Sequence, residues 1–202
     1  MNILYEDNHI IAVNKTSSEI VQGDKTGDKP LSDLLKDYIK VKYNKPGDVF
    51  LGVTHRLDRP VSGVVLFART SKALTRLNEM FREQKVEKTY WAVVQNKPKE
   101  AEGRLEHYLV RNEKQNKSFV YESEKQNSKK ACLTYRLIAS SDRYHLLEVK
   151  LETGRHHQIR CQLAAMGCPI KGDLKYGSPR SNPNQGISLH ARSVDFIHPV
   201  SS

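Results

Sequence analysis

The stretch THRLDRPVSGVVLFART, residues 54–70, decides the fold of this 202-residue chain. Its second half, GVVLFA at residues 63–68, is a short apolar run of the kind found in strands that are buried on both faces. Its first half is polar and places one acid, Asp58, among arginines. We therefore expect a buried strand in the middle of the fold, preceded by a polar segment that presents Asp58.

The local sequence allows two interpretations of Asp58. Side chains alternate along an extended segment, so Arg56 and Asp58 would share an exposed face while His55 and Leu57 point the other way. Nearby guanidinium groups favour an ionised carboxylate, which suits a nucleophile or an electrostatic anchor at neutral pH. The alternative is an ordinary surface ion pair, worth about 0 to 1 kcal/mol. Both interpretations stand on this stretch alone.

Strand and helix patterns follow one another on both sides of this stretch. Alternating apolar and polar residues predict a hairpin near the N-terminus and several short strands between residues 103 and 151. Apolar residues at helical spacing predict three helices. The first is expected to be capped by Ser32, the second by Thr70 or Ser71, and the third to end at Gly167. With no linker or internal repeat, residues 1–202 are expected to form a single α+β domain around a mixed sheet.

The composition favours a nucleic-acid partner. Lys and Arg number 33 against 23 Asp and Glu, and the net charge of +10 is spread along the chain. Such a surface suits a polyanion because each neutralised phosphate releases counterions, although many basic proteins are merely soluble. No apolar run approaches the roughly 20 residues of a membrane span, and the N-terminus does not resemble a signal peptide. We expect a cytoplasmic protein.

A second polar cluster is TGRHHQIR, residues 153–160. On a helix, Arg160 would lie near His156 and His157, and Gln158 would add another hydrogen-bonding group. The amide groups at the start of that helix, with Arg155, could hold a phosphate. The adjacent histidines point about 100° apart on a helix and cannot chelate a metal by themselves. The three cysteines show no metal-binding or disulfide spacing, so neither type of site is expected.

A third segment, EKTYWAVV at residues 87–94, reads as a strand with Tyr90 and Trp91 on opposite faces. One ring can therefore be part of the core while the other lines a cleft, although packing is the default role for both. The chain contains no phosphate-binding or dinucleotide-binding glycine pattern.

Taken in order, these segments resemble the RluA family of pseudouridine synthases. The resemblance covers about residues 5–199 and rests mainly on HRLDRPVSGVVLFART and LETGRHHQIRCQLAAMGCPIKGDLKYG, with weaker support from YEDNHIIAVNK, KTYWAVV and LHARSVDFIHP. It implies an enzyme that isomerises uridine in structured RNA, ribosomal or transfer RNA, to pseudouridine without metal or organic cofactor. It also implies a mixed, largely antiparallel sheet flanked by helices and loops, with an RNA-binding cleft.

The resemblance also assigns roles to residues. Asp58 matches the family's catalytic aspartate, Arg160 the basic residue that pairs with it, and Tyr90 the tyrosine that lies against the target ring. Arg56 matches the arginine that helps to hold the base out of the helix. Further contacts with the RNA are expected from His55, Arg155, His157 and Gln158.

Three positions depart from the family pattern: residues 16–18 after Lys15, Val61 where Thr is usual, and His156 where Thr or Ser is usual. These changes bear on local hydrogen bonding and on RNA preference more than on the reaction. The expected protein is a monomer without the small N-terminal RNA-binding domain that some members have. The alternatives are a catalytically inactive RNA-binding protein with the same fold and an unrelated aspartate-dependent hydrolase.

Overall fold

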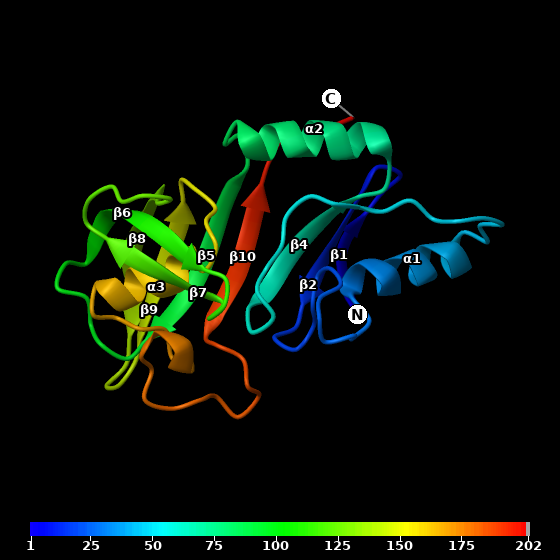
Figure 1. Ribbon diagram of the computed structural model, residues 1–202. Helices are drawn as coiled ribbons and strands as arrows, with labels where there is room; N and C mark the ends of the chain where they lie inside the picture. Colours follow the sequence, from blue (N-terminus) through cyan, green and yellow to red (C-terminus); the bar gives the residue numbers. More distant parts are fainter. Residues whose placement is uncertain (201–202) are drawn as a thin grey trace. The chain divides into compact units, whose positions relative to one another are not determined.

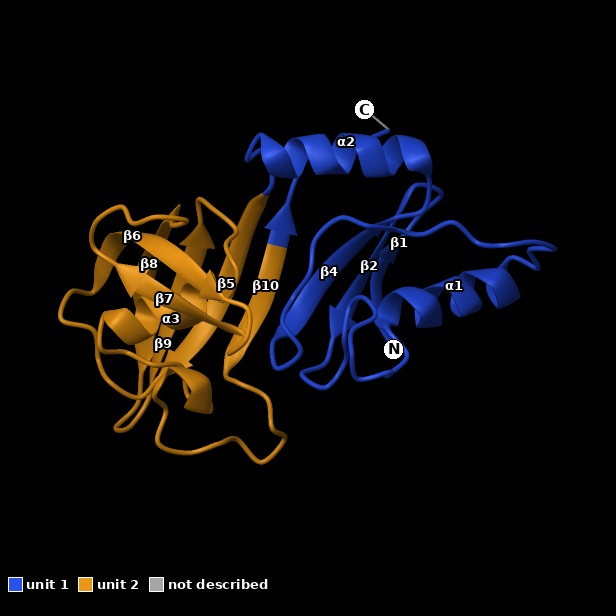
Figure 2. Ribbon diagram, in the orientation of Figure 1, with its two compact units in different colours: residues 1–86, 194–202 blue, residues 87–193 orange. Residues whose placement is uncertain are grey.

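The computed structural model describes residues 1–200, which form two compact units. The N-terminal unit comprises Met1–Val86 together with the C-terminal segment from Val194, and the central unit comprises Glu87–Ser193 (Figure 2). Each unit has its own strands, its own helices and its own buried residues, and each is described separately below.

The N-terminal unit is built on a small antiparallel sheet (Figure 1). Its strands are β1 (Asn2–Glu6), β2 (Ile10–Lys15), β3 (Gly52–Val53) and β4 (Ser62–Ala68). β2 pairs with both β1 and β4, and β3 pairs with β4. Asp7 closes the predicted hairpin, because its carboxylate accepts hydrogen bonds from the backbone N–H groups of His9 and Ile10. β4 is the buried apolar strand expected from the sequence, and Val65 and Phe67 are fully buried.

Two helices belong to this unit, α1 (Leu31–Lys42) and α2 (Ser71–Arg82). The cap predicted for α2 is confirmed, since the Thr70 hydroxyl accepts a hydrogen bond from the N–H of Ala73. The cap predicted for α1 is wrong. Pro30 is the capping residue and Ser32 lies buried inside the first turn, because its N–H and that of Leu31 bond to the backbone of residues 20 and 21.

The central unit contains an antiparallel sheet in the order β5–β9–β8–β6–β7, with the start of β10 beside β5. The strands are β5 (Glu87–Val94), β6 (Glu102–Asn112), β7 (Lys117–Tyr121), β8 (Lys129–Ser140), β9 (His145–Leu151) and β10 (Leu189–Asp195). Two of these strands, β6 and β8, are long, whereas the sequence pattern indicated only short ones.

The helix α3 (Gln158–Ala165) and a 3-10 turn, η1 (Leu174–Tyr176), pack in this unit. α3 begins later than predicted, because His157 has a left-handed φ of 54° and His156 therefore lies outside the helix. The predicted stop is confirmed, with Gly167 at a φ of 84° that suits glycine.

The fold class is α+β, with a mixed, largely antiparallel arrangement of strands flanked by helices and loops, as predicted. None of the helices in residues 1–200 is long and apolar enough to cross a membrane.

Candidate active site

Asp58 lies in the N-terminal unit, on a turn between β3 and β4. The N–H of Val61 donates to the carbonyl of Asp58 at 3.0 Å, which closes the turn. Leu57 and Val61 are buried on either side, Asp58 is half-buried and Arg56 is exposed. Arg56 is exposed and Leu57 is buried as predicted, whereas Asp58 is less exposed than predicted. Because both flanks are packed against the core, the backbone at Asp58 has little freedom to move.

His55 faces β4. Its Nε2 accepts a hydrogen bond from the N–H of Leu66 at 3.0 Å, and its ring lies 5.0 Å from that of Phe81. Thr54 is also joined to the carbonyl of Leu66. These contacts fix the segment that leads to Asp58.

Lys15 supports the same turn through hydrogen bonds to its backbone. No sequence pattern predicts this role. Its side chain is only 1% exposed, and its ammonium donates to the carbonyls of Thr16, Arg59 and Val61 at 2.8, 3.0 and 2.7 Å. Burial lowers the pKa of Lys15 to about 8, against the opposing attraction of Glu19 and Asp58. A buried cation thus holds two carbonyls of the turn after Asp58, those of Arg59 and Val61.

Arg59, the next residue after Asp58, contacts a surface loop. Its guanidinium donates to Asp28 at 2.8 Å, Thr26 at 2.8 Å and Asp24 at 3.3 Å, all in the loop before α1. These partners are largely exposed, so the pairs contribute little to stability. Arg59 therefore ties a surface loop to the turn.

Tyr90 and Trp91 lie in the central unit on β5, on opposite faces as predicted. Tyr90 is 8% exposed and stands opposite Val149 of β9. Trp91 is half-buried, and the guanidinium of Arg192 lies 4.7 Å from its ring centre. Tyr90 is thus nearly buried on a strand that has β9 on one side and β10 on the other.

Arg160 is a buried cation in the first turn of α3, and only 5% of it is exposed. Its Nε and one terminal nitrogen donate to the two carboxylate oxygens of Asp173, at 2.7 and 2.9 Å. Asp173 is itself 1% exposed. A two-point contact of this kind fixes both the position and the orientation of the guanidinium plane. No sequence pattern predicts that Asp173 is the partner of Arg160.

His157 contacts the other side of the same guanidinium. Its Nε2 lies 3.1 Å from a terminal nitrogen of Arg160, and its Nδ1 lies 2.8 Å from the hydroxyl of Tyr176. Arginine can only donate, so Nε2 accepts and the proton is on Nδ1. Burial and the charge of Arg160 lower the pKa of His157 to about 2, which agrees with a neutral ring. The left-handed backbone at His157 aims the ring at Arg160.

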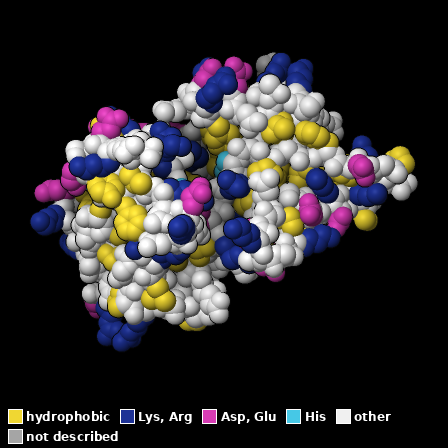
Figure 3. All heavy atoms as spheres, viewed as in Figure 1, with side chains coloured by type: hydrophobic (Ala, Val, Ile, Leu, Met, Phe, Trp, Pro, Cys, Tyr) yellow, Lys and Arg dark blue, Asp and Glu magenta, His cyan; other side chains and the backbone are white. Residues whose placement is uncertain are grey.

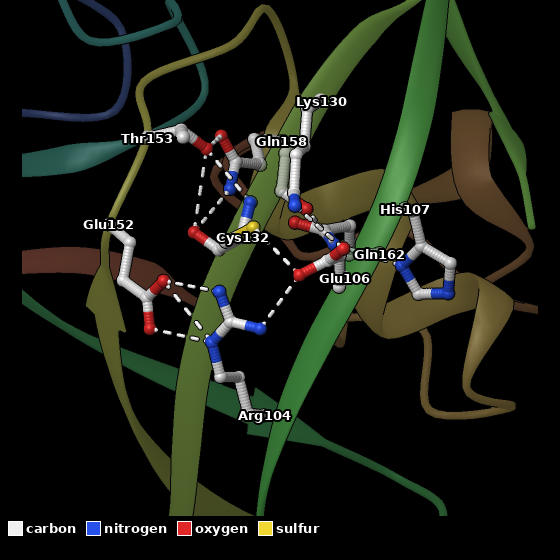
Figure 4. Close-up of polar contacts among 10 residues, drawn as sticks. Arg104, Glu106, His107, Lys130, Cys132, Glu152, Thr153, Gln158 and Gln162 are labelled. Carbon is white, nitrogen blue, oxygen red and sulfur yellow. Dashed lines mark hydrogen bonds and ion pairs between the residues drawn. The ribbon is translucent and has the colours of Figure 1, made fainter. Parts of the chain in front are cut away.

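The segment before α3 is fastened to β8 through the backbone of Cys132 (Figure 4). The N–H of Cys132 donates to Thr153 at 2.9 Å, and its carbonyl accepts from the amide of Gln158 at 3.0 Å. The other end of the Gln158 amide accepts from the Thr153 hydroxyl and from the N–H of Arg155. Gln158 is buried and engaged at both ends, whereas Arg155 is exposed and donates to the carbonyl of Lys130.

An ion-pair network lies on the surface beside this segment (Figure 4). Arg104 joins Glu152 and Glu106, and Lys130 also pairs with Glu106. The side chains are substantially exposed, so the network orders the start of the segment more than it stabilises the fold.

His156 lies outside α3, stacked on His157 with ring centres 3.7 Å apart. Its Nδ1 lies 2.8 Å from the hydroxyl of Ser118, and its Nε2 lies 3.1 Å from Asn116. The prediction that His156 and His157 lie on the helix is therefore wrong, because α3 begins at Gln158. The predicted proximity of His157 to Arg160 is confirmed by the 3.1 Å contact between them. Among residues 1–200 there is no group of three or more His, Cys, Asp or Glu side chains that could hold a metal ion.

Comparisons with known proteins give a consistent result. The sequence matches the family model described as RNA pseudouridylate synthase over residues 9–165, a range that includes Asp58, Tyr90 and Arg160. The tRNA pseudouridine synthase C of Vibrio parahaemolyticus is 32% identical over 223 residues, which cover all of this chain and 87% of that protein. The ribosomal large subunit pseudouridine synthase C of Rickettsia bellii is 34% identical over 194 residues, which cover 95% of this chain.

The chain spans 62% of the length of the Rickettsia protein and 62% of an uncharacterized RNA pseudouridine synthase of Synechocystis, which is 33% identical. Among solved structures, human RNA pseudouridylate synthase domain containing 4 matches with a TM-score of 0.82 at 24% identity. That match covers 96% of this chain and 84% of the human chain, and it shows that the fold is shared.

Proposed function

Because the chain belongs to the RNA pseudouridylate synthase family, we propose that it isomerises uridine to pseudouridine in structured RNA, either ribosomal or transfer RNA. The observation that supports this most strongly is the family match over residues 9–165, with Asp58, Tyr90 and Arg160 inside it. Similar proteins with names that specify transfer RNA and the large ribosomal subunit support the choice of RNA.

In this proposal Asp58 is the catalytic carboxylate. The bond from the ribose to nitrogen 1 of uracil breaks, the ring turns, and carbon 5 bonds to the same ribose carbon. An anionic oxygen can attack the nucleotide or stabilise positive charge on the ribose, whereas a neutral amide can do neither well. The turn closed by Val61 and held by Lys15 supports this role, because it presents the carboxylate on a fixed backbone.

Tyr90 would lie against the target ring, and Tyr90 or a water beside it would accept the proton that leaves carbon 5. Arg160 would pair with Asp58, as the family resemblance implies. A guanidinium has five donors, so Arg160 can hold Asp173 and His157 and still serve a second carboxylate.

The target uridine has to leave its stack, which costs a few kcal/mol. We propose that exposed Arg56 occupies the vacated space and that exposed Arg155 grips a phosphate. His55 contacts the same RNA region in this proposal. We assign His157 and Gln158 to positioning instead, because both are buried and bonded to Arg160 and Cys132.

We also propose that residues 1–202 act as one catalytic domain, in the cytoplasm, as a monomer and without a metal or organic cofactor. The family match supports one domain, because residues 9–165 include parts of both compact units.

The test is release of tritium from carbon 5 of labelled uridine, measured with total RNA from cells that lack this gene. Release by the wild-type chain, followed by mapping of the new pseudouridines, would identify the RNA and the position. Binding of this RNA without any release would instead favour an inactive RNA-binding protein.

A further inference from the structure

The hairpin formed by β6 and β7 exposes two aromatic rings. Phe119 and Tyr121 are 37% and 38% exposed and lie two residues apart on β7, so both emerge on one face. They line a groove of about 590 Å³ that also includes Val110, Arg111 and Lys114. We call this the hairpin groove. Its rings take no part in the core, in contrast to Val120 between them, which packs against the cluster of Leu109, Ala131, Cys161 and Tyr176.

The charges around these rings are mainly positive. Arg111 and Lys114 line the hairpin groove with a single acid, Glu113, and the ammonium of Lys117 lies 5.5 Å from the ring centre of Phe119. Figure 3 shows apolar side chains interspersed with Lys and Arg side chains on the face where β6 and β7 lie. Flat aromatic faces beside cations are the combination that binds unpaired nucleotides, by stacking on bases and by neutralising phosphates.

The tip of the hairpin is fastened to the segment that holds Arg160. The N–H of Ser118 donates to the hydroxyl of Tyr176 at 2.9 Å, and this hydroxyl also contacts His157, the neighbour of Arg160. Lys175 donates to the carbonyls of residues 115 and 116 at 3.2 and 2.9 Å. These bonds lie within the central unit, so the hairpin groove keeps a defined position relative to Arg160.

We propose that the hairpin groove is an RNA-docking surface, on which unpaired bases near the target uridine stack against Phe119 and Tyr121. Arg111, Lys114 and Lys117 neutralise the adjoining phosphates. This inference rests on the proposed function and extends it, because it names the part of the surface that selects the RNA beyond the reacting nucleotide. RNA is favoured over a protein partner because three cations surround two small exposed rings, and a stable protein interface needs a larger apolar area.

The first test is the double variant Phe119→Ala/Tyr121→Ala. Its Kd for total RNA from cells lacking the gene, and its KM with the same RNA, should rise at least about tenfold, because each base loses its stacking partner. The kcat at saturating RNA should stay within about twofold of wild type, since an interaction made equally before and during reaction changes KM alone.

The matched control is Tyr144→Ala. Tyr144 is also 38% exposed, also belongs to the central unit, and also has a lysine ammonium, that of Lys171, 5.5 Å from its ring centre. It lies on the β8–β9 turn and does not line the hairpin groove. This variant should bind RNA as the wild type does. Equal losses in both variants would overturn the proposal, as would an unchanged Kd in the double variant.

The second test is photo-crosslinking to 4-thiouridine-substituted transfer and ribosomal RNA, followed by trypsin. Cleavage after Lys117 and Lys125 releases residues 118–125, a peptide that contains both rings. Cross-links on this peptide support the proposal. Cross-links elsewhere on the protein but not on this peptide overturn it, and a protein interaction lost in the double variant with RNA binding intact would point to a protein partner instead.

These outcomes separate the two proposals. RNA binding with cross-links at residues 118–125 but no tritium release from any RNA would contradict the proposed function and leave the docking surface standing. Tritium release with an RNA Kd that is unchanged in Phe119→Ala/Tyr121→Ala would support the proposed function and contradict the docking surface.

Discussion

The turn at Asp58 and the segment at Arg160 each depend on a buried cation, but the two cations are neutralised in different ways. Lys15 is surrounded by three carbonyl oxygens, which are neutral acceptors. Arg160 is bound at two points by the carboxylate of Asp173 and contacted by neutral His157. Burial therefore lowers the pKa of Lys15 to about 8, whereas an arginine stays charged at all pH values of interest.

The Asp58 half of the proposed machinery is therefore sensitive to pH, and the Arg160 half to the loss of a single carboxylate. The Asp58 turn is held by the hydrogen bond from the Val61 N–H and by the Lys15 ammonium, which bonds backbone carbonyls of the turn. The position of Arg160 is held by two side chains, those of His157 just before α3 and Asp173 just before η1. We expect substitutions at Lys15 to change the pH dependence of turnover, and substitutions at Asp173 to lower the free energy of unfolding.

The largest effect is expected from Asp173→Asn, which leaves the buried guanidinium of Arg160 without its counter-charge. Removing one partner of a buried ion pair costs about 3–5 kcal/mol. Chemical denaturation should show that loss in the free energy of unfolding. Asp142→Asn, at an exposed acid in the β8–β9 turn, is the control and should change it by less than about 0.5 kcal/mol.

The double variant Arg160→Met/Asp173→Leu separates stability from activity. Replacing both charges with apolar groups should recover much of the lost stability. It should not recover tritium release, because the proposed reaction needs the guanidinium. A stable double variant that turns over RNA would contradict the role of Arg160.

A smaller effect is expected from Lys15→Met. This change leaves three carbonyls without their donor but also removes the cost of burying an ammonium, so the free energy of unfolding should fall by about 2 kcal/mol. Turnover should fall at least tenfold, because a turn that has lost these hydrogen bonds would displace the Asp58 carboxylate slightly. Lys72→Met on the exposed side of α2 serves as the control. Wild-type turnover in Lys15→Met would show that the turn does not need this lysine.

The pH dependence of turnover gives a further contrast. Lys15 loses its proton near pH 8 in the folded protein and near 10.5 when unfolded. The unfolded chain binds more protons between these values, so Lys15 makes folding more favourable as the pH rises through this window. The kcat should nevertheless fall above about pH 8, because a neutral amine donates two hydrogen bonds instead of three and no longer attracts Asp58. This limb of the pH–rate profile should be absent in Lys15→Gln.

The smallest effect is expected from Arg59→Gln. The partners Asp24 and Asp28 are exposed, so the free energy of unfolding should change by less than about 1 kcal/mol. A loss above about 2 kcal/mol, measured by denaturation in urea, would mean that the loop before α1 is part of the support for Asp58.

Local sequence patterns predicted the presence of strands and helices better than the residues at which they begin. The apolar run at β4, the hairpin of β1 and β2, and the hydroxyl cap of α2 all follow from side chains close together in the sequence. Ser32 was assigned wrongly because the backbone of residues 20 and 21 already bonds the start of α1. His156 was placed on α3 because no sequence pattern predicted the left-handed conformation of His157.

Some of the site residues could be proposed from the sequence, and others could be found only from the fold. Asp58, Tyr90 and Arg160 could be proposed from motif positions, and their roles stay predictions. Lys15 and Asp173 could not, because the partners of Lys15 lie as far as 46 residues away and that of Asp173 lies 13 residues away. Lys15 ends a buried strand and Asp173 lies in the segment GDLKYG, residues 172–177, but only the fold shows what each of them contacts.

The most direct test of the central claim is the turnover of Asp58→Ala beside the wild type, with the same RNA and equal protein. We expect no tritium release above background from the variant, with a Tm within about 3 °C of the wild type and an RNA Kd within about threefold, since Asp58 lies on a turn whose support comes from its neighbours. Release at a tenth of the wild-type rate or more would contradict catalysis by this carboxylate.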